Sequence, residues 1–370
     1  MQCNAVSLVG FRNIEEASLR FSPGVNVLYG NNAQGKTNML EAIYFAAIGK
    51  SFRSLHSKEV IGFGRDSASL SVDFTAAGRV QNITMHLFQS RTKAVEKNHV
   101  KIHKMSELVG AFRAVLFCPE QLFLIKGGPA ERRQFLDIAI SGIEPAYLGA
   151  LQRYAHVLKQ RNALIRNAEK DRAVFDATID LWSAQLAREG AYIARSRKRY
   201  IDKATPYVAA CFAEMTNERE TPSLLYVGPN KSAEVDYEDV EEMEHMLYRR
   251  LCENHEREIA AGATLYGIHK DDMEVMLNER EARIYASQGQ QRSLALSLKL
   301  AEGEICREDC GEYPVFLFDD VLSELDGMRK EYLLQKIAGK QVILTTCEQI
   351  TQKTDHLILV DKGTFREMNG

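Results

Sequence analysis

The sequence predicts an α/β fold in which both ends of the chain build one domain and a mainly helical lobe is inserted between them. Strand-like segments occur near both ends. Residues 129–215 carry long helical periodicity with few breaking residues. An apolar strand, a glycine-rich loop and an amphipathic helix follow one another near residue 30. We therefore expect one domain from residues 1–128 and 262–370, and a helical lobe over 129–261.

The length and charge of the chain limit the alternatives. A chain of 370 residues suits two domains or one large domain with an inserted lobe. The formal net charge of -3 gives no overall basic field, so a site for DNA would have to be a local patch. There is no apolar run long enough for a membrane span. The first residues lack the features of a secretory signal, so we expect a cytoplasmic protein.

The cysteines are scattered and odd in number, and no Cys-x-x-Cys pair occurs. This pattern predicts neither a disulfide framework nor a zinc site, and it suits a reducing compartment. Cys306 and Cys310 lie four residues apart on a predicted helix, which favours two thiols on one helix face over a functional pair.

Periodicity predicts the remaining elements of the first part of the chain. Strands are expected over Val6–Val9, Ala17–Phe21 and Val25–Tyr29. A helix should begin at about Lys36, and alternating residues in 66–102 predict β-hairpins.

The second part of the chain shows a change in pattern at residue 220. Residues 220–240 are polar, and a charged helix is expected from about Val240 to Ala261. Another helix should run from about Gln288 to Cys306. The last predicted strands are expected to be buried, as strands of parallel sheets are: the very apolar Pro314–Phe318, then Gln341–Thr345 and His356–Val360.

A phosphate-binding loop is predicted at Gly30–Thr37, which matches G-x-x-x-x-G-K-[ST] between a strand and a helix. Glycines let backbone N–H groups turn toward phosphates, and the helix N-terminus adds a partial positive charge. Lys36 would reach the β/γ-phosphate oxygens of ATP, and Thr37 would bind Mg²⁺. A chance glycine loop is the alternative, and the correct flanks disfavour it. The expected nucleotide-binding residues are Gly30, Asn31, Asn32, Ala33, Gln34, Gly35, Lys36 and Thr37.

Two carboxylates end the apolar strand before residue 320. Ligands of open α/β sheets bind at the carboxyl ends of strands. Asp319 is therefore a predicted Mg²⁺ ligand, and Asp320 a catalytic residue that orients the attacking water, alongside Lys36. The alternative is that Asp320 only caps the helix that follows.

The segment Ser287–Ser293 opens a predicted helix and resembles the signature motif of ABC-type ATPases. In that superfamily the motif binds the γ-phosphate of ATP held by a partner subunit. A capping serine, a glycine and exposed N–H groups suit an anion, although an ordinary capped helix remains an alternative. The residues expected to contact ATP in this way are Ser287, Gln288, Gly289 and Gln290.

Other segments resemble ABC-type ATPases with two departures. Ser323–Asp326 resembles the loop that follows the acidic strand. Thr345 and Thr346 stand where transporters carry a switch histidine, and Asp320 stands where they use Glu. The resemblance thus implies a slow ATPase that is not a standard transporter motor.

Across essentially its whole length the chain resembles the RecF family of bacterial recombination mediators. Leu8–Asn13 resembles the start of related SMC-like repair ATPases and places Arg12 and Asn13 beside the predicted nucleotide. The departures are Ile268, Lys270 and Gln121, where we expect Pro, Arg and an acid. The motifs that carry the resemblance are Gly49–Arg53, Pro119–Leu122, Gly128–Asp137, Ser287–Arg292, Ala295–Glu302 and Asp319–Asp326.

The RecF resemblance implies a function in recombinational repair and replication restart. It implies an ATP-dependent homodimer that binds double-stranded and single-stranded DNA and favours their junctions. Our hypothesis is that closure of the dimer clamps DNA and that slow hydrolysis releases it. It also implies RecR-type and RecO-type mediator proteins as partners, in the loading of a recombinase. Three alternatives stay open: ATP as a dimerisation ligand only, a transporter ATPase subunit, and a nuclease. The long insert opposes the second, and no acidic metal-site module supports the third.

A local basic patch is the candidate for DNA. Residues 126–203 hold 15 Lys/Arg against 9 Asp/Glu, whereas residues 214–258 hold 13 acids against 5 bases. Such runs are more often solvated helix faces. Arg132 and Arg133 fit the family pattern and are candidates either for DNA or for pinning the lobe. The densest basic cluster is Arg195, Arg197, Lys198 and Arg199.

Overall fold

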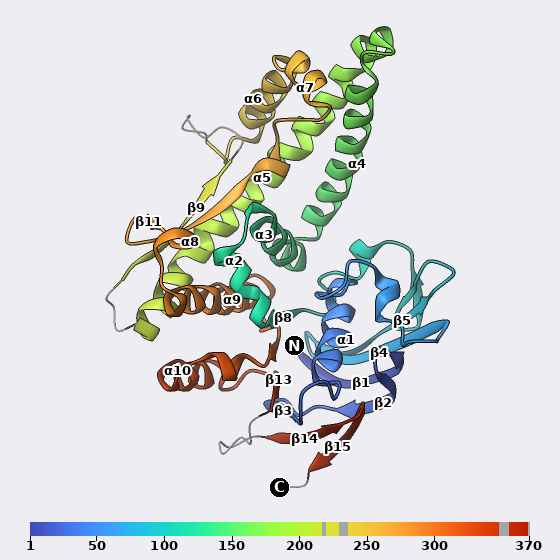
Figure 1. Cartoon of the computed structure of the whole chain (residues 1–370), viewed down its shortest axis with the longest axis vertical. Helices are drawn as coiled ribbons and strands as arrows, with labels where there is room; N and C mark the ends of the chain where they lie inside the picture. Colours follow the sequence, from blue (N-terminus) through green and yellow to red (C-terminus); the bar gives the residue numbers. More distant parts are fainter. Residues whose placement is uncertain (217–219, 229–235, 348–354, 369–370) are drawn as a thin grey trace. The chain divides into compact units, whose positions relative to one another are not determined.

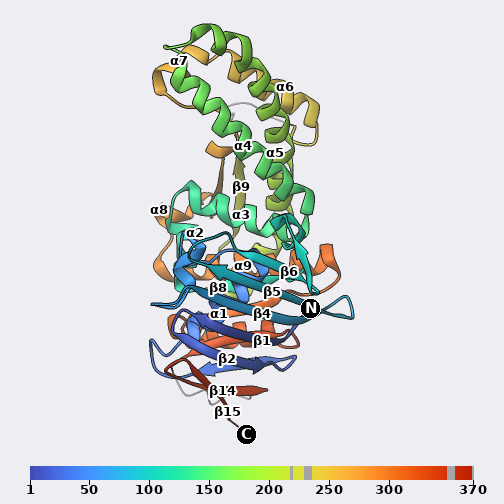
Figure 2. The ribbon, with the colours of Figure 1, turned by 90° about the vertical axis from the view of Figure 1, so that its right-hand side faces the viewer.

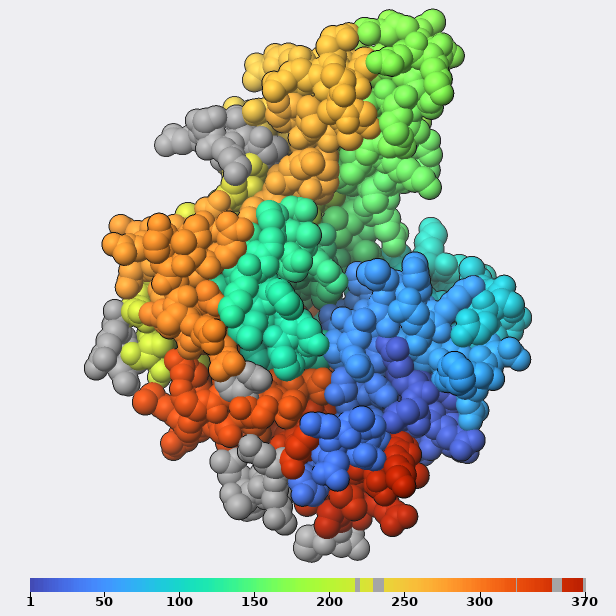
Figure 3. Space-filling model, in the orientation of Figure 1, coloured from blue at the N-terminus to red at the C-terminus, as the bar shows by residue number. Residues whose placement is uncertain are grey.

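The computed structural model describes residues 1–216, 220–228, 236–347 and 355–368. The chain divides into two compact units. Unit 1 comprises Met1–Leu122, Ala210–Arg219 and Arg292–Gly370, and unit 2 comprises Phe123–Ala209 and Glu220–Gln291. In unit 1 the two ends of the chain intermix, as the adjoining blue and red surfaces of Figure 3 show.

Unit 1 contains a mostly parallel sheet in the order β15-β14-β3-β13-β12-β8. All its neighbours pair in parallel except β15, which is antiparallel to β14. The central strands are buried along their length because both faces of such a sheet are covered. The strands are β3 (Val25–Tyr29), β8 (Ala114–Phe117), β12 (Val315–Asp319), β13 (Val342–Thr346), β14 (His356–Asp361) and β15 (Thr364–Met368).

A second sheet of unit 1 is antiparallel, in the order β2-β1-β4-β5-β6-β7 (Figure 2). In β4 and β5 buried residues alternate with more exposed ones, the pattern of a sheet with one covered face. The strands are β1 (Gln2–Phe11), β2 (Ile14–Arg20), β4 (Ser67–Ala76), β5 (Arg79–Phe88), β6 (Ala94–Lys97) and β7 (Val100–Ile102).

Helix α1 (Lys36–Ile48) packs against both sheets, contacting β12 and β8 of one and β4 and β1 of the other. It is buried nearly all round rather than on one stripe, as a helix between two layers must be. The same unit contains α10 (Gly327–Ile337) and most of α9 (Gln288–Cys310).

Unit 2 is mainly helical. Its long helices are α3 (Pro129–Ile143), α4 (Pro145–Asn167) and the first part of α5 (Arg172–Thr216). The shorter helices α6 and α7 lie beside α5 and α4 (Figure 1). An antiparallel sheet β11-β10-β9 completes the unit. The shorter elements are α2 (Phe123–Lys126), α6 (Val240–Cys252), α7 (His255–Ala261), α8 (Ala282–Tyr285), β9 (Pro222–Val227), β10 (Asp272–Leu277) and β11 (Arg280–Glu281).

The fold class and most predicted elements are confirmed, with differences in detail. The polar stretch after residue 220 contains strand β9, which pairs with β10. The predicted helix 240–261 is broken between Cys252 and His255. The compact units also differ from the predicted domains, because residues 262–291 belong to unit 2 and Ala210–Arg219 to unit 1. Within the described part of the chain, no helix is long and apolar enough to span a membrane.

Candidate nucleotide-binding site

The predicted phosphate loop connects β3 to α1, and two of its glycines have backbone angles that favour glycine. Gly30 has φ +157°, and a Cβ there would lie 2.3 Å from the Val360 carbonyl oxygen. Gly35 has φ +112° and directly precedes the helix. A side chain at either position would strain the backbone, so these glycines allow a tight loop at the helix N-terminus. That N-terminus is an intrinsic anion site.

The ammonium of Lys36 lies inside the curve of this loop. Its Nζ donates to the carbonyl oxygens of Gly30, at 2.5 Å, and Asn31, at 2.7 Å. It also lies 3.3 Å from Cys347 Sγ. Hydrogen bonds from an ammonium to phosphate are stronger than those to neutral carbonyls, so a bound phosphate would compete effectively for Lys36.

The rest of the loop is anchored from one side and exposed on the other. The backbone N–H groups of Lys362 and Gly363 donate to Gln34, at 2.6 and 2.8 Å. Cys347 donates to Asn32 Oδ1 at 2.8 Å. Asn31, Asn32 and Ala33 are themselves exposed. The turn between β14 and β15 thus supports the loop while its rim stays accessible.

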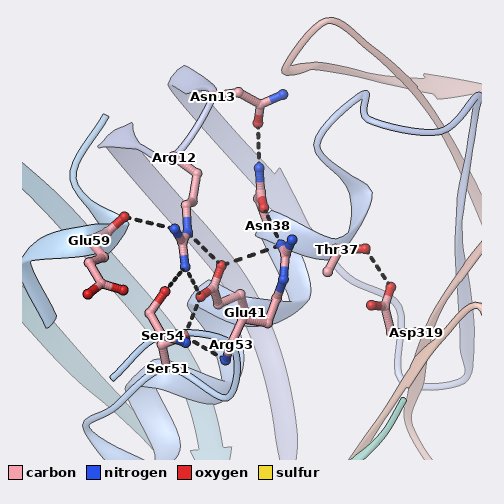
Figure 4. Close-up of polar contacts among 10 residues, drawn as sticks. All are labelled: Arg12, Asn13, Thr37, Asn38, Glu41, Ser51, Arg53, Ser54, Glu59 and Asp319. Carbon is pink, nitrogen blue, oxygen red and sulfur yellow. Dashed lines mark hydrogen bonds and ion pairs between the residues drawn. The ribbon is translucent and has the colours of Figure 1, made fainter. Parts of the chain in front are cut away.

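The two predicted Mg²⁺ ligands meet in the structure. Thr37 Oγ1 donates to Asp319 Oδ1 at 2.8 Å (Figure 4), and Thr345 Oγ1 donates to the same oxygen at 2.8 Å. Burial raises the pKa of Asp319, the hydrogen bonds from Thr345 and Thr37 lower it, and the charge of Glu120 raises it again. The Thr37 hydroxyl on α1 and the Asp319 carboxylate at the end of β12 suit Mg²⁺, because this ion prefers oxygen ligands. A bound Mg²⁺ would also offset the negative charges of Asp319 and Glu120. Neither Thr345 nor Glu120 was given a role from the sequence.

Asp320 has a left-handed backbone, with φ +51°. Its N–H donates to Thr345 Oγ1 at 2.9 Å. It occupies the position before a short 3₁₀ turn, Val321–Glu324, yet its side chain makes no capping hydrogen bond there. This observation weakens the alternative that Asp320 only caps the turn that follows it.

A polar network that the sequence did not predict centres on Glu41 of α1 (Figure 4). Glu41 is fully buried and accepts two hydrogen bonds from Arg12, at 2.9 and 2.6 Å, and one from Ser51, at 2.5 Å. Ser51 Oγ in turn accepts from the N–H groups of Arg53 and Ser54. Glu41 therefore ties Arg12 to the segment after α1. An acid within the apolar part of α1, after its polar first turn, was the available signal.

Asn13 is connected to the phosphate loop through polar side chains. Its Nδ2 donates to the Ala33 carbonyl oxygen at 3.4 Å, and its Oδ1 accepts from Asn38 at 2.7 Å. Arg53 donates to the other end of the Asn38 amide at 3.0 Å. Asn13 thus lies at the loop, whereas the guanidinium of Arg12 is engaged by Glu41, Ser54 and the Glu59 carbonyl.

The signature-like segment forms a capped helix start in unit 2. Ser287 Oγ accepts from the Gln290 N–H at 3.3 Å, and Gln290 Oε1 accepts from the Ser287 N–H at 2.5 Å. This reciprocal pair is a capping box. Ser287 and Gln288 are exposed, and Gly289 and Gln290 are partly exposed. The N-terminus of α9 is therefore held open to solvent rather than buried under a neighbouring element.

The four basic residues proposed for DNA differ in their surroundings. Arg197 is buried, and its guanidinium bonds to Asp137, Tyr147 and the Ile268 carbonyl. This burial argues against a contact between Arg197 and DNA. The other three form ion pairs on a more exposed surface: Arg195 and Arg199 with Glu238, and Lys198 with Asp202.

Arg132 and Arg133 join α3 to the start of β10. Arg132 makes two 2.7 Å hydrogen bonds to the Asp272 carboxylate, and Arg133 donates to the Asp271 carbonyl at 2.6 Å. A two-pronged guanidinium–carboxylate pair fixes orientation as well as distance. These contacts support a structural role within unit 2.

Comparison with known proteins decides the family. The model of the RecF/RecN/SMC N-terminal domain matches residues 3–365. A DNA replication and repair protein RecF of Clostridium perfringens is 36% identical over 370 residues, covering 100% of this chain and 99% of its own. The RecF protein of Staphylococcus carnosus is 38% identical over 376 residues, covering 100% of this chain and 99% of its own.

The chain belongs to the RecF family. A solved structure described as the recombination mediator protein RecF with ATP, in the RecFOR pathway, superposes with a TM-score of 0.92 at 31% identity, covering 100% of this chain and 98% of its own. The Smc head domain of Pyrococcus furiosus gives a TM-score of 0.57 at 16% identity, over 100% of this chain and 96% of its own, and so shares the fold. The predicted family and the ABC-type ATPase fold are thereby confirmed.

Two of the three departures from the RecF pattern, Lys270 and Gln121, can now be placed. Lys270 is exposed. The neighbouring Asp271 is buried and lies 3.7 Å from Arg197 and hydrogen-bonded to Tyr226. Gln121 lies in a short turn, where its amide is 3.9 Å from Cys118 Sγ. Neither change removes a side chain from the phosphate loop or from the Thr37–Asp319 pair.

Proposed function

We propose that this protein is an ATP-dependent DNA-binding protein of recombinational repair and replication restart. Two copies would enclose two ATP molecules with Mg²⁺, close on DNA at single/double-strand junctions, and open on slow hydrolysis. RecR-type and RecO-type proteins would be its partners in loading a recombinase. RecF relatives named for DNA replication and repair, and a RecF–ATP structure, support this assignment.

One observation carries the shared-site part of this proposal. The chain has two separate helix N-termini that would suit an anion: the one after the loop before α1 in unit 1, and the one at the capping box that opens α9. ATP bound at the loop before α1 of one copy would place its γ-phosphate against the N-terminus of α9 in another copy, as the ABC-type resemblance implies. In that arrangement Lys36 binds the phosphates, Thr37 and Asp319 hold Mg²⁺, and Asp320 orients water.

The proposed DNA surface is the part of the basic cluster that solvent reaches: Arg199, which is exposed, with Arg195 and Lys198, which are partly exposed. Their carboxylate partners, Glu238 and Asp202, would have to be exchanged for phosphate oxygens. Such an exchange between exposed charges changes free energy little, so these contacts would add to affinity modestly and in a salt-dependent way.

Sedimentation tests the shared site directly. The wild-type protein should become a dimer with ATP and Mg²⁺ and then bind a gapped duplex tightly. Lys36→Ala should abolish both effects, because a point charge on the phosphates is lost. Lys362→Ala is a matched control, since Lys362 contacts the loop through its backbone N–H and its side chain is exposed. A Lys36→Ala protein that dimerises normally would overturn the proposal.

Complementation separates a shared site from two independent ones. Lys36→Ala and Ser287→Arg should each be inactive as ATPases. A mixed dimer of the two has one site with both defects and one intact site. Equal mixing should therefore restore activity, to about a quarter of the wild-type value when the two variants pair at random, because about half the dimers are then mixed. No recovery, with mixed dimers demonstrated, would favour sites contained within one copy.

Asp320→Asn tests the rival in which ATP is only a dimerisation ligand. Under our proposal this variant binds ATP, dimerises and closes on DNA but opens slowly, because the residue that orients water is lost. Unchanged release of DNA from Asp320→Asn, at wild-type ATP affinity, would favour the rival.

A further inference from the structure

Three side chains of metal-binding type meet in unit 2, far from the nucleotide site in sequence. Asp180 lies on α5, Cys252 ends α6 and His255 begins α7. Cys252 Sγ lies 3.6 Å from Asp180 Oδ1, and His255 Nε2 lies 3.9 Å from the same oxygen. The three ligand atoms all lie within 4.8 Å of one another.

We propose that Asp180, Cys252 and His255 bind a divalent transition-metal ion of the zinc class. Zinc is bound tetrahedrally by thiolate, imidazole and carboxylate at about 2.3, 2.0 and 2.1 Å. A tetrahedron with those bonds separates sulfur from oxygen by about 3.6 Å and nitrogen from oxygen by about 3.4 Å. The sulfur–oxygen separation of 3.6 Å equals the first value, and the nitrogen–oxygen separation of 3.9 Å exceeds the second by about 0.5 Å. A water molecule would be the fourth ligand.

The imidazole supplies a second, independent observation. His255 Nε2 is a buried atom with no hydrogen-bond partner among the residues that the structure describes. Buried polar atoms without partners are uncommon and need a physical account. The ring is held edge-on against Phe175, with ring centroids 5.6 Å apart. A simple thiol–carboxylate hydrogen bond accounts for Cys252 and Asp180 but leaves His255 unexplained, whereas an ion uses all three.

The charges around the cluster also suit a divalent cation. Arg161 is paired with Glu258 at 2.6 Å, and Arg172 with Glu256 at 2.7 Å. These two arginines are therefore already balanced by acids. A carboxylate and a thiolate at the cluster would balance the two positive charges of the ion.

An ion at this place would join segments that are distant in sequence. Cys252 and His255 flank the break between α6 and α7, and Asp180 belongs to α5. The site would hold this helix break against α5 and so stiffen that part of unit 2. No Cys-x-x-Cys pair marks it, which is why the sequence predicted no zinc site.

Cobalt titration tests the site with a readout independent of ATP. Untagged full-length protein, stripped with a chelator, is titrated with Co²⁺, whose absorption reveals thiolate and tetrahedral ligation. We expect one Co²⁺ per chain with a thiolate–metal band, displaced by one equivalent of Zn²⁺. Cys252→Ser should lose that band and weaken Zn²⁺ binding at least tenfold.

Cys310→Ser is the matched control, since Cys310 is another partly exposed thiol, on α9. It should keep the cobalt spectrum. His255→Gln and Asp180→Asn each remove one ligand and should weaken Zn²⁺ binding even if Cys252→Ser fails to fold, which circular dichroism would show. Equal Co²⁺ spectra in wild type, Cys252→Ser and His255→Gln, or a cobalt spectrum without a thiolate band, would overturn the proposal.

Discussion

Two arginines, one in each unit, use the same chemistry for different ends. Arg12 in unit 1 makes two hydrogen bonds to the buried Glu41, and its own side chain is 22% exposed. Arg197 in unit 2 is 2% exposed and bonds to Asp137, Tyr147 and the Ile268 carbonyl. The first network borders the phosphate loop, whereas the second joins α5, α3 and the segment before β10. The two arginines therefore have different roles because of their surroundings: Arg12 supports the predicted ligand site, and Arg197 supports the core of unit 2.

Arg197→Met should give the largest loss of stability. Removing Arg197 leaves Asp137 without its cation and the Ile268 carbonyl without a donor, at a cost of about 3–5 kcal/mol. Chemical denaturation with circular dichroism would measure the free energy of unfolding. Arg188→Met, at an exposed position of the same helix, is the control and should change it by less than about 1 kcal/mol. A small effect of Arg197→Met would show that the Arg197 network does not contribute more to stability than the Arg12–Glu41 network.

The pH dependence of unit 2 gives a second test, through His269. Burial lowers its pKa from 6.5 to about 4, and the Tyr154 hydroxyl lies 2.7 Å from its Nδ1. Between these pH values the unfolded chain binds a proton that the folded chain does not. The free energy of unfolding is therefore unaffected by His269 above pH 6.5. It falls by up to about 3 kcal/mol as the pH drops from 6.5 toward 4.

His269→Gln should remove most of that loss. Burial raises the pKa of Asp271 from 3.8 to about 7, which acts in the opposite direction over an overlapping range. The difference between wild type and His269→Gln cancels the Asp271 contribution to first order, so this difference is the quantity to measure. An identical fall in stability between pH 7 and 4 in both proteins would contradict the assignment.

Glu41→Gln tests the unit 1 network, with a smaller expected effect. The amide keeps the shape but loses the charge that holds Arg12, so we expect a loss of about 1–3 kcal/mol in stability. ATP binding should weaken as well, since the network ties α1 to the segments beside the loop. Fluorescent-nucleotide titration measures this, and Glu59→Gln is a control because its backbone carbonyl, not its carboxylate, accepts from Arg12. Unaltered ATP affinity in Glu41→Gln would show that the Arg12–Glu41 pair stabilises the fold but does not support ATP binding.

The sequence predicted those parts of the site that are contiguous or that follow fixed geometry. Gly30–Thr37 is a single segment, and the meeting of Thr37 with Asp319 follows from the edge at which parallel strands end. The role of Glu41 was missed, because it depends on which loops cover one position of α1. Strand β9 was missed because its polar surroundings hide a short segment that pairs only with distant β10.

The density of basic residues along the sequence, in contrast, did not predict which of them lie on the surface. Arg195, Arg197, Lys198 and Arg199 are adjacent in sequence, but a helix turns 100° per residue and sends them to different surroundings. Arg197 consequently lies in the core, while Lys198 and Arg199 lie outside. Which residue of a basic run faces inward depends on acids elsewhere, here Asp137 and Asp271.

The smallest expected effect is that of Arg199→Ala on the outer surface of unit 2. Its ion pair with Glu238 joins two exposed side chains, so its loss should change stability by less than about 1 kcal/mol. If Arg199 contacts phosphate, the affinity for DNA falls severalfold and the slope of log K against log salt becomes shallower by about one. Fluorescence anisotropy at several salt concentrations measures both quantities. Arg249→Ala, at an exposed position of α6, is the control. An unchanged salt slope in Arg199→Ala would show that Arg199 does not contact DNA, as burial already argues for Arg197. The buried and the exposed arginines would then differ only in what they contribute to stability.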